Sequence, residues 1–207
     1  MIVKVCGMRE PRNIRAVEQT GADLMGFIFH PKSPRYVAAR PEYLPTAQRR
    51  VGVFVNAPID DILGKAREYS LDYIQLHGDE SPEFCRALKD EGLRVIRALG
   101  IASAADAERA ADYAMADLLL FDTKTPQRGG SGRRFNWEAL AAYSGNVPFL
   151  LSGGITPQSA DDILAFTHPQ FAGIDINSGF ETAPALKDAE AIRLFIQKLK
   201  GKQPQQS

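Results

Sequence analysis

The sequence predicts an α/β protein, a single-domain (β/α)8 barrel of the TIM type, on three observations. Short apolar or β-branched runs alternate with helix-like segments almost from end to end. Eight such runs occur, and several are continuously apolar, as parallel strands covered on both faces are. The last two runs end in glycine-rich turns, and the loops after strands seven and eight usually bind phosphate in this fold.

The eight predicted strands are short and contain few polar residues. They cover residues 2–6, 24–29, 50–55, 73–77, 94–99, 117–121, 148–151 and 172–176. An open, doubly wound sheet is the alternative. It usually carries a G-x-G-x-x-G sequence after its first strand, which Cys6-Gly7-Met8-Arg9 does not match. A barrel is therefore the favoured architecture.

Helix signals lie between these runs. Pro11 occupies a first helical turn, and Gly21 is expected to end that helix. Ser81-Pro82 and Thr156-Pro157 each combine an N-cap residue with a proline suited to the first helical position. Asn136-Trp137-Glu138 opens a further helix. The remaining helices are predicted from apolar faces at Ile59–Tyr69 and Ala189–Leu199, with a weak helix rich in proline at 41–48.

Length and composition limit the functional classes. The chain has 207 residues, which suits one domain over residues 1–200, and the Gln- and Lys-rich stretch 201–207 is expected to be a disordered tail. Charge is balanced at 25 basic and 25 acidic residues without a basic block, so no nucleic acid partner is expected. No apolar run approaches the roughly 20 residues of a membrane span. Two cysteines form no disulfide framework, and we expect a cytoplasmic protein.

The two glycine-rich turns predict a site for an anion. Ser152-Gly153-Gly154 follows strand seven, and Asn177-Ser178-Gly179 follows strand eight. Small residues leave backbone N–H groups exposed, and converging N–H donors bind phosphate. A phosphorylated small molecule is therefore the expected substrate.

Cys6 and Asp122 are candidates for proton transfer because each stands at the carboxyl end of a strand, where barrel enzymes place catalytic residues. A thiolate at Cys6 suits a base, although a small buried hydrophobic role is the alternative. Asp122 closes an apolar run and suits a general acid, although a helix cap or a solvated loop residue is the alternative. Cys85, inside a helical pattern, is assigned to the core.

Other candidates lie on loops around the same end of the barrel. Arg35 follows two stiffening prolines and could clamp a carboxylate through paired hydrogen bonds, or be an ordinary surface arginine. The segment 123–134 combines glycines with Arg and Lys and is expected to form a lid over an anion. His77 ends strand four with no assigned role. No metal site is expected, since no histidine has acidic partners at ligand spacing.

An ordered set of motifs then identifies a resemblance. Its members are Lys4–Met8, the segment from Gly26 to Tyr36, Val51–Asn56, Ile74–Gly78, Asp122 with the glycines at 129–132, Leu151–Ile155 and Asp175–Gly179. Over nearly its whole length the chain closely resembles the phosphoribosylanthranilate isomerase family of tryptophan biosynthesis. Met8 and Arg9 stand where that family commonly has Ile and Thr.

The resemblance implies an Amadori rearrangement of N-(5′-phosphoribosyl)anthranilate on a (β/α)8 barrel, without a metal or cofactor. It implies that Cys6 is the base and Asp122 the acid, and that Arg35 binds the substrate carboxylate. It also implies that Gly153, Gly154, Asn177, Ser178 and Gly179 bind the phosphate. The resemblance does not give the oligomeric state, and we expect a monomer or a homodimer.

Two other functions remain open from the residues alone. One is a different sugar-phosphate isomerase or lyase on the same barrel, including activity on a related substrate of histidine biosynthesis. The other is a phosphosugar-binding module without turnover. Retention of both proton-transfer candidates disfavours the binding module.

Overall fold

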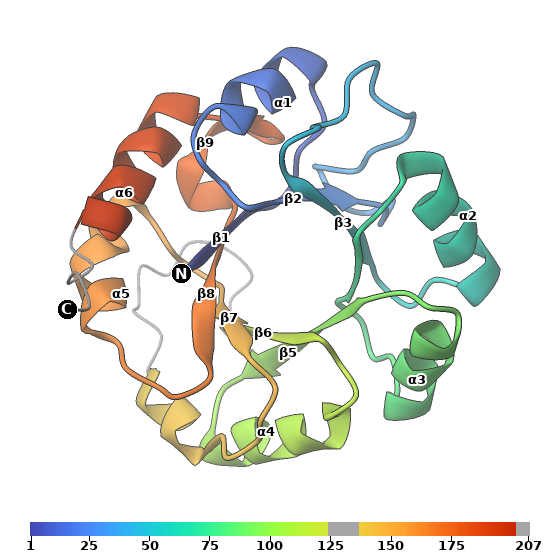
Figure 1. The fold of residues 1–207 in the computed structure, drawn as a ribbon, viewed down its shortest axis with the longest axis vertical. Helices are drawn as coiled ribbons and strands as arrows, with labels where there is room; N and C mark the ends of the chain where they lie inside the picture. The colour runs from blue at the N-terminus through green and yellow to red at the C-terminus, as the bar shows by residue number, and fades with distance from the viewer. Residues whose placement is uncertain (124–136, 202–207) are drawn as a thin grey trace.

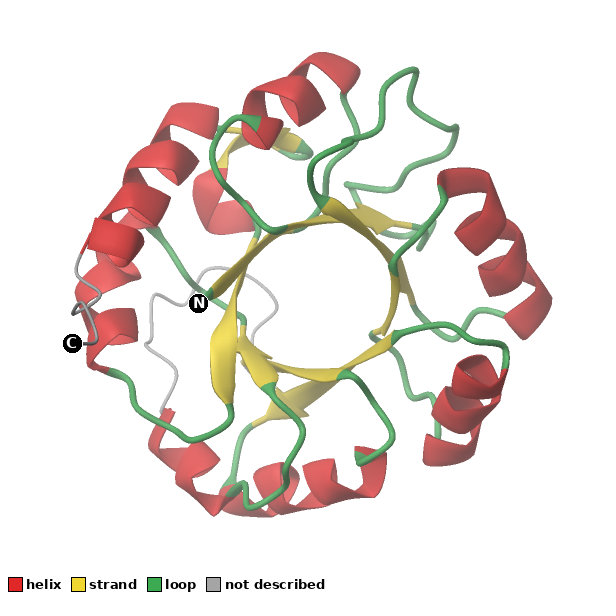
Figure 2. Cartoon of the chain, viewed as in Figure 1, coloured by secondary structure: helices red, strands yellow, loops and turns green. Residues whose placement is uncertain are grey.

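Eight parallel strands close into a barrel in the order of the chain, β1 to β8, with β8 pairing β1. The computed structural model describes residues 1–123 and 137–201. Figures 1 and 2 show the strands as an inner ring and the helices as an outer ring. The strands are Ile2–Val5, Leu24–Ile28, Arg49–Phe54, Tyr73–Leu76, Val95–Ile101, Leu118–Thr123, Phe149–Leu151 and Phe171–Ile176. The predicted barrel and all eight predicted strands are confirmed.

Helical segments connect most successive strands along the outside of the barrel. The α-helices are α1 Pro11–Glu18, α2 Ile59–Tyr69, α3 Pro82–Asp90, α4 Ala104–Glu108, α5 Ala160–Ala165 and α6 Ala189–Gly201. The 3-10 helices are η1 Arg109–Tyr113, η2 Trp137–Ala142, η3 Pro157–Ser159 and η4 Ser178–Phe180. The predicted opening at 136–138 thus leads into a 3-10 helix rather than an α-helix.

The predicted N-caps are confirmed at both Ser-Pro and Thr-Pro steps. Ser81 Oγ accepts a hydrogen bond from the Phe84 N–H at 3.3 Å. Thr156 forms a capping box with Ser159, and η3 leads directly into α5. The first helix ends at Glu18, before Gly21, which lies in the following turn at a φ of 86°.

The weak helix predicted at 41–48 is wrong, because this stretch contains no helix. Prolines at 41 and 45 remove two backbone donors that a helix would use. The N–H groups of Thr46 and Ala47 donate instead to the Glu18 carboxylate, at 2.6 and 3.0 Å. A side chain of α1 therefore organises the connection between β2 and β3.

Apolar side chains pack on both faces of the strands. One cluster consists mainly of strand side chains and fills the barrel interior; it includes Leu24, Val51, Tyr73, Leu118 and Leu120. Larger clusters lie between the strands and the helices that cover them. Because side chains alternate along a strand, the interior residues fix which strand-end residues point into the barrel mouth. Asp122 follows Leu118 and Leu120 at spacing two, so it faces inward.

A short hairpin after β8 was not predicted from the sequence. Its strands, β9 Glu181–Ala183 and β10 Leu186–Lys187, are antiparallel. The hairpin brings Glu181 and Lys187 together at the barrel mouth, where they form an ion pair of 2.5 Å. The helix that follows includes Gly201; the predicted tail at 202–207 and the predicted lid after Thr123 lie outside the described residues.

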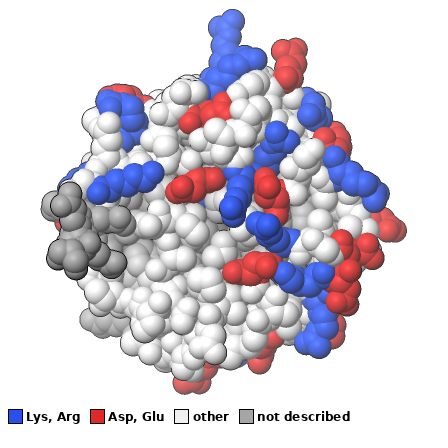
Figure 3. All heavy atoms as spheres, in the orientation of Figure 1, with Lys and Arg blue, Asp and Glu red and all other residues white. Residues whose placement is uncertain are grey.

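The molecular surface carries charges of both signs. On the face shown in Figure 3, the described Lys and Arg side chains are interspersed with Asp and Glu. Among the helices that the structure describes, none is long and apolar enough to cross a bilayer.

Replacing Ser70 by glycine should stabilise the fold. Ser70 follows α2 with a φ of 49° and is exposed, so its side chain resists this backbone conformation without useful packing. We expect Ser70→Gly to raise the free energy of unfolding by about 0.5–1 kcal/mol, after the added flexibility of the unfolded chain is subtracted. Urea denaturation measures this, with Ser70→Ala as control. Equal stabilisation by alanine would contradict the explanation.

Candidate active site

Four inward-facing side chains meet at the carboxyl ends of the strands. Cys6 follows β1, His77 follows β4, and Asp122 and Asp175 lie in β6 and β8. The carboxyl ends of the strands are the end of a barrel at which active sites form. The sequence analysis placed Cys6, His77 and Asp122 at strand ends, and the closed barrel brings all four residues to one mouth.

Cys6 lies in the buried part of this mouth, beside a buried ion pair. Its exposed fraction is 4%. Lys4, two residues earlier, is opposite Asp175 in the β1–β8 register, and its Nζ lies 2.8 Å from Asp175 Oδ1. Burial raises the pKa of the Cys6 thiol, and the charges of Lys4 and Lys187 oppose that rise. The sulfur is thus shielded from solvent, and the positive charges of Lys4 and Lys187 act on it.

Asp122 lies in a more open part of the mouth. Its side chain is 33% exposed, and its Oδ2 lies 3.5 Å from Nε2 of His77, which is 38% exposed. The other ring nitrogen of His77 lies 3.0 Å from the amide nitrogen of Gln75. The His77 ring therefore lies between the Gln75 amide and the Asp122 carboxylate. His77 is therefore a neighbour of the candidate acid.

Asp175 lies close enough to both proton-transfer candidates to interact with their charges. Burial raises the pKa of Asp175; the charge of Asp122 raises it further, and Lys4 lowers it. The charge of Asp175 in turn contributes to the raised pKa of Cys6. Cys6 and Asp122, which belong to different strand ends of one closed barrel, therefore both interact with the charge of Asp175.

Arg35 lies beside Cys6, but part of its guanidinium is already engaged. Its Nε and Nη2 donate to the Glu181 carboxylate at 2.9 and 2.6 Å. A Cβ atom on Gly7 would lie 2.7 Å from Arg35 Cδ, so the arginine packs against the residue that follows Cys6. Hydrogen bonding to Glu181 raises the pKa of Arg35. The sequence analysis expected Arg35 to form paired hydrogen bonds with a substrate carboxylate. In the structure, the edge of the guanidinium formed by Nε and Nη2 makes such bonds with Glu181.

Glu181 and Lys187 are site residues that the sequence analysis did not identify. Burial opposes ionisation of Glu181, but hydrogen bonds from Arg35 and Lys187 lower its pKa. Lys187 also donates to Asn177 Oδ1 at 2.6 Å. These contacts join the hairpin, the β2–β3 connection and the loop after β8 into one polar wall. No sequence spacing indicates the wall, because its members meet only in the fold.

The two glycine-rich turns lie against each other. Gly153 and Gly154 follow β7 with φ angles of 84° and 65°, a conformation that favours glycine. A Cβ atom on Gly179 would lie 2.1 Å from the Ile155 carbonyl oxygen, so the turn after β8 packs directly on the turn after β7. Ser178 begins η4, and the first backbone N–H groups of a helix have no hydrogen-bond acceptor within that helix. The arrangement suits an anion bound by backbone N–H groups.

Other polar residues at this end support the loops. Asn56, at a φ of 51°, accepts a hydrogen bond from the Asp79 N–H at 2.7 Å and donates its own N–H to Glu80 at 2.8 Å. It therefore joins the loops after β3 and β4. Among the described residues, no group of three His, Cys, Asp or Glu side chains is placed to hold a metal.

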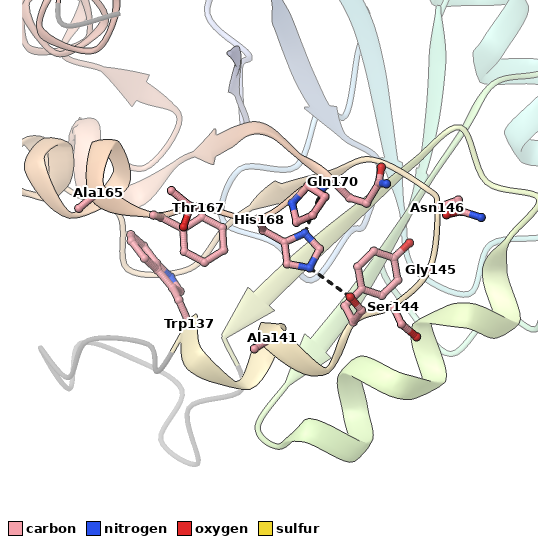
Figure 4. A pocket seen from close by; sticks show the side chains of 12 residues that line it. Trp137, Ala141, Ser144, Gly145, Asn146, Ala165, Thr167, His168 and Gln170 are labelled. Atoms are coloured by element: carbon pink, nitrogen blue, oxygen red, sulfur yellow. Dashed lines mark hydrogen bonds between the residues drawn. The ribbon is translucent and has the colours of Figure 1, made fainter. Parts of the chain in front are cut away.

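A cavity of about 740 Å³ lies elsewhere, between the loops that lead into β7 and β8. Figure 4 shows His168 at its centre, with Trp137 and Ala165 on its border. Both ring nitrogens of His168 are engaged, by the Tyr143 carbonyl at 3.1 Å and the Gln170 N–H at 3.0 Å. These loops stand at the opposite end of the strands from Cys6 and Asp122, so this cavity is separate from the candidate site.

Comparisons with known proteins agree with one another. A family model described as N-(5′-phosphoribosyl)anthranilate (PRA) isomerase matches residues 3–198. A curated protein of that name from Phocaeicola vulgatus is 59% identical over 98% of this chain and 99% of its own. Another protein of that name, from Parabacteroides distasonis, is 49% identical over 96% of this chain and 93% of its own.

Solved structures give the same result. The phosphoribosyl anthranilate isomerase from Thermotoga maritima matches with a TM-score of 0.85 and 38% identity, covering 97% of this chain and 100% of that chain. A second structure, of a phosphoribosyl anthranilate isomerase in complex with reduced 1-(o-carboxyphenylamino)-1-deoxyribulose 5-phosphate, matches with a TM-score of 0.82 at 34% identity over the same shares. A third, at the same score, identity and shares, comes from work on monomers of a dimeric Thermotoga maritima enzyme.

Proposed function

The chain belongs to the phosphoribosylanthranilate isomerase family and is an isomerase of tryptophan biosynthesis, and from that premise we propose which residues perform its reaction. The reaction converts N-(5′-phosphoribosyl)anthranilate to 1-(2-carboxyphenylamino)-1-deoxyribulose 5-phosphate, so the enzyme is an intramolecular oxidoreductase. Cys6 is the base and Asp122 the acid. The supporting observation is that Cys6, which follows β1, and Asp122, in β6, lie at the same end of one closed barrel and both interact with the charge of Asp175.

The rearrangement requires one proton to be given and one to be taken. Asp122 protonates the ring oxygen, and the furanose opens to an iminium ion. The Cys6 thiolate then removes the C2′ proton, and the electrons of that C–H bond form the C1′–C2′ double bond of an enolamine. The enolamine tautomerises to the ketone. Because the two steps act on different atoms, the acid and base must stand apart, as Cys6 and Asp122 do.

Substrate binding uses the two ends of the molecule. We assign the phosphate to the backbone of Gly153, Gly154, Asn177, Ser178 and Gly179, because the turns after β7 and β8 pack together there. We assign the anthranilate carboxylate to Arg35, which lies beside Cys6. Glu181 holds Arg35 in place, and the remaining guanidinium edge meets the substrate.

The assigned reaction needs neither a metal nor a cofactor. We place the enzyme in the cytoplasm, acting on a small phosphorylated sugar as a monomer or a homodimer. The dimeric enzyme of Thermotoga maritima favours the homodimer.

Loss of anthranilate fluorescence on addition of purified protein tests the activity, and a progress curve without product would favour the binding module instead.

Replacing Arg35 by alanine tests the carboxylate site. A charge-assisted hydrogen bond contributes about 1.5–3 kcal/mol, so we expect KM for the anthranilate substrate to rise about 10- to 150-fold with little change in kcat. The matched measurement uses the phosphoribosyl derivative of aniline, which lacks the carboxylate. Wild-type enzyme should bind that compound about as weakly as the variant does. If Arg35→Ala weakened both compounds equally, Arg35 would act through the fold rather than on the carboxylate.

A further inference from the structure

A buried lysine lies beneath the reacting cysteine, and the assigned reaction gives it no role. Lys4 has an exposed fraction of 0%, and its Nζ is bound by Asp175 Oδ1 at 2.8 Å. Burying an ammonium group is costly even when it is paired, and an apolar pair of similar volume is often as stable. The cost suggests that the charge is retained for what lies next to it.

Lys4 and Cys6 share one small space inside the barrel. Lys4 lies in β1 and Cys6 follows its last residue, where the Cys6 N–H continues the pairing with β8, so the two side chains, two residues apart, point the same way. On the neighbouring strand β2, a Cβ atom added to Gly26 would lie 2.8 Å from Cys6 Sγ and 3.2 Å from Lys4 Nζ. Only a residue without a side chain leaves room for both groups here. The sulfur and the ammonium group therefore lie together against Gly26.

The charges around the sulfur favour its ionised form. Lys4 from β1, Lys187 from the hairpin and Arg35 from the β2–β3 connection all interact with the charge of Cys6. Asp175 and Glu181 are the carboxylates bound to these cations. Three cations and two carboxylates leave one net positive charge, which a thiolate balances.

Lys4 is the cation in this group that lies with the sulfur against Gly26. Burial raises the pKa of Cys6, while the charge of Lys4 and a hydrogen bond from it lower that pKa. Burial lowers the pKa of Lys4 itself, but the charges of Asp175 and Cys6 raise it above its ordinary value. These charges therefore favour the protonated form of Lys4 beside the sulfur.

We propose that Lys4 is a positioning residue that stabilises the thiolate of Cys6, the form that accepts the C2′ proton, while Asp175 fixes the ammonium group. This inference rests on the proposed role of Cys6 as the base. In the step concerned, the C2′–H bond breaks and an S–H bond forms. The electron pair of the broken bond converts the C1′–C2′ single bond into a double bond, and the iminium nitrogen becomes neutral. Lys4 gives no proton to the substrate.

The experiment titrates Cys6 directly, by the ultraviolet absorbance of its thiolate, with the Cys6→Ser spectrum subtracted. Removing Lys4 alone would leave Asp175 buried without its partner and could prevent folding. Lys4→Met/Asp175→Asn, in which a neutral pair remains, is therefore compared with the wild type and with Asp175→Asn, in which Cys6 is the anion left beside Lys4. Loss of the lysine should raise the midpoint by about one to two pH units, and the acidic limb of kcat/KM should move equally. Lys4→Arg should retain much of the wild-type midpoint.

Two controls separate the possible outcomes. Lys89→Met removes a lysine paired with Asp117 at the opposite end of the barrel, and it should leave the titration and the activity unchanged. An unmoved midpoint in the double variant, whatever its activity, overturns the inference and leaves Lys4 a structural residue. Full activity of Cys6→Ser would instead refute the assigned base, while the absorbance titration would still report on Lys4.

Discussion

Cys6→Ser is expected to lower kcat by about 10²- to 10⁴-fold, the usual contribution of a single acid or base. The serine hydroxyl fills nearly the same space, so binding should be preserved, but it does not ionise near neutral pH and is a much weaker base than a thiolate. KM should therefore change little. Steady-state assay by loss of anthranilate fluorescence measures both constants.

The other cysteine supplies the control for this prediction. Cys85 is buried in α3, and burial raises its pKa to about 11, so it remains a thiol at neutral pH. Cys85→Ala should keep full activity per folded molecule. Activity of Cys6→Ser near the wild-type value would show that another group takes the C2′ proton.

Asp122→Asn is expected to cause a loss of similar size, about 10²- to 10⁴-fold in kcat. The amide has the shape of the carboxyl group and can still contact His77, but it has no acidic proton to give to the ring oxygen. Opening of the furanose should then become rate-limiting. Single-turnover kinetics measure this step apart from product release.

Asp112→Asn, on the exposed surface of η1, makes the same chemical change away from the mouth and should leave kcat unaltered. The product analogue should bind Asp122→Asn about as well as the wild type. A loss of binding equal to the loss of kcat would instead show that Asp122 holds the substrate and does not protonate it.

The strands could be predicted because burial on both faces leaves an apolar run, and the helix starts because Ser81 and Thr156 precede prolines. The stretch 41–48 was misread because the contact that decides its conformation, with Glu18, comes from another helix. Strands as short as β9 and β10 contain too few residues to show a pattern. The local signals were therefore reliable, and conformations set by distant contacts were missed.

The candidate site divides in the same way. The strand ends identified Cys6, Asp122 and His77 as candidates, because a closed parallel barrel brings all of its strand ends together. Lys4 was read only as part of a strand, although a charge two residues before Cys6 in an apolar run was a usable signal. Glu181 and Lys187 could not be found in this way, because their pairing with Arg35 depends on the fold of the hairpin.

The central claim is that Cys6 and Asp122 act on one substrate from opposite sides. A crystal structure of this protein with reduced 1-(o-carboxyphenylamino)-1-deoxyribulose 5-phosphate tests it most directly. We expect the phosphate on the turns after β7 and β8, Cys6 Sγ about 3–3.5 Å from C2′, and Asp122 within about 3.2 Å of the former ring oxygen. A bound sugar that reaches only one of these two side chains would contradict the account.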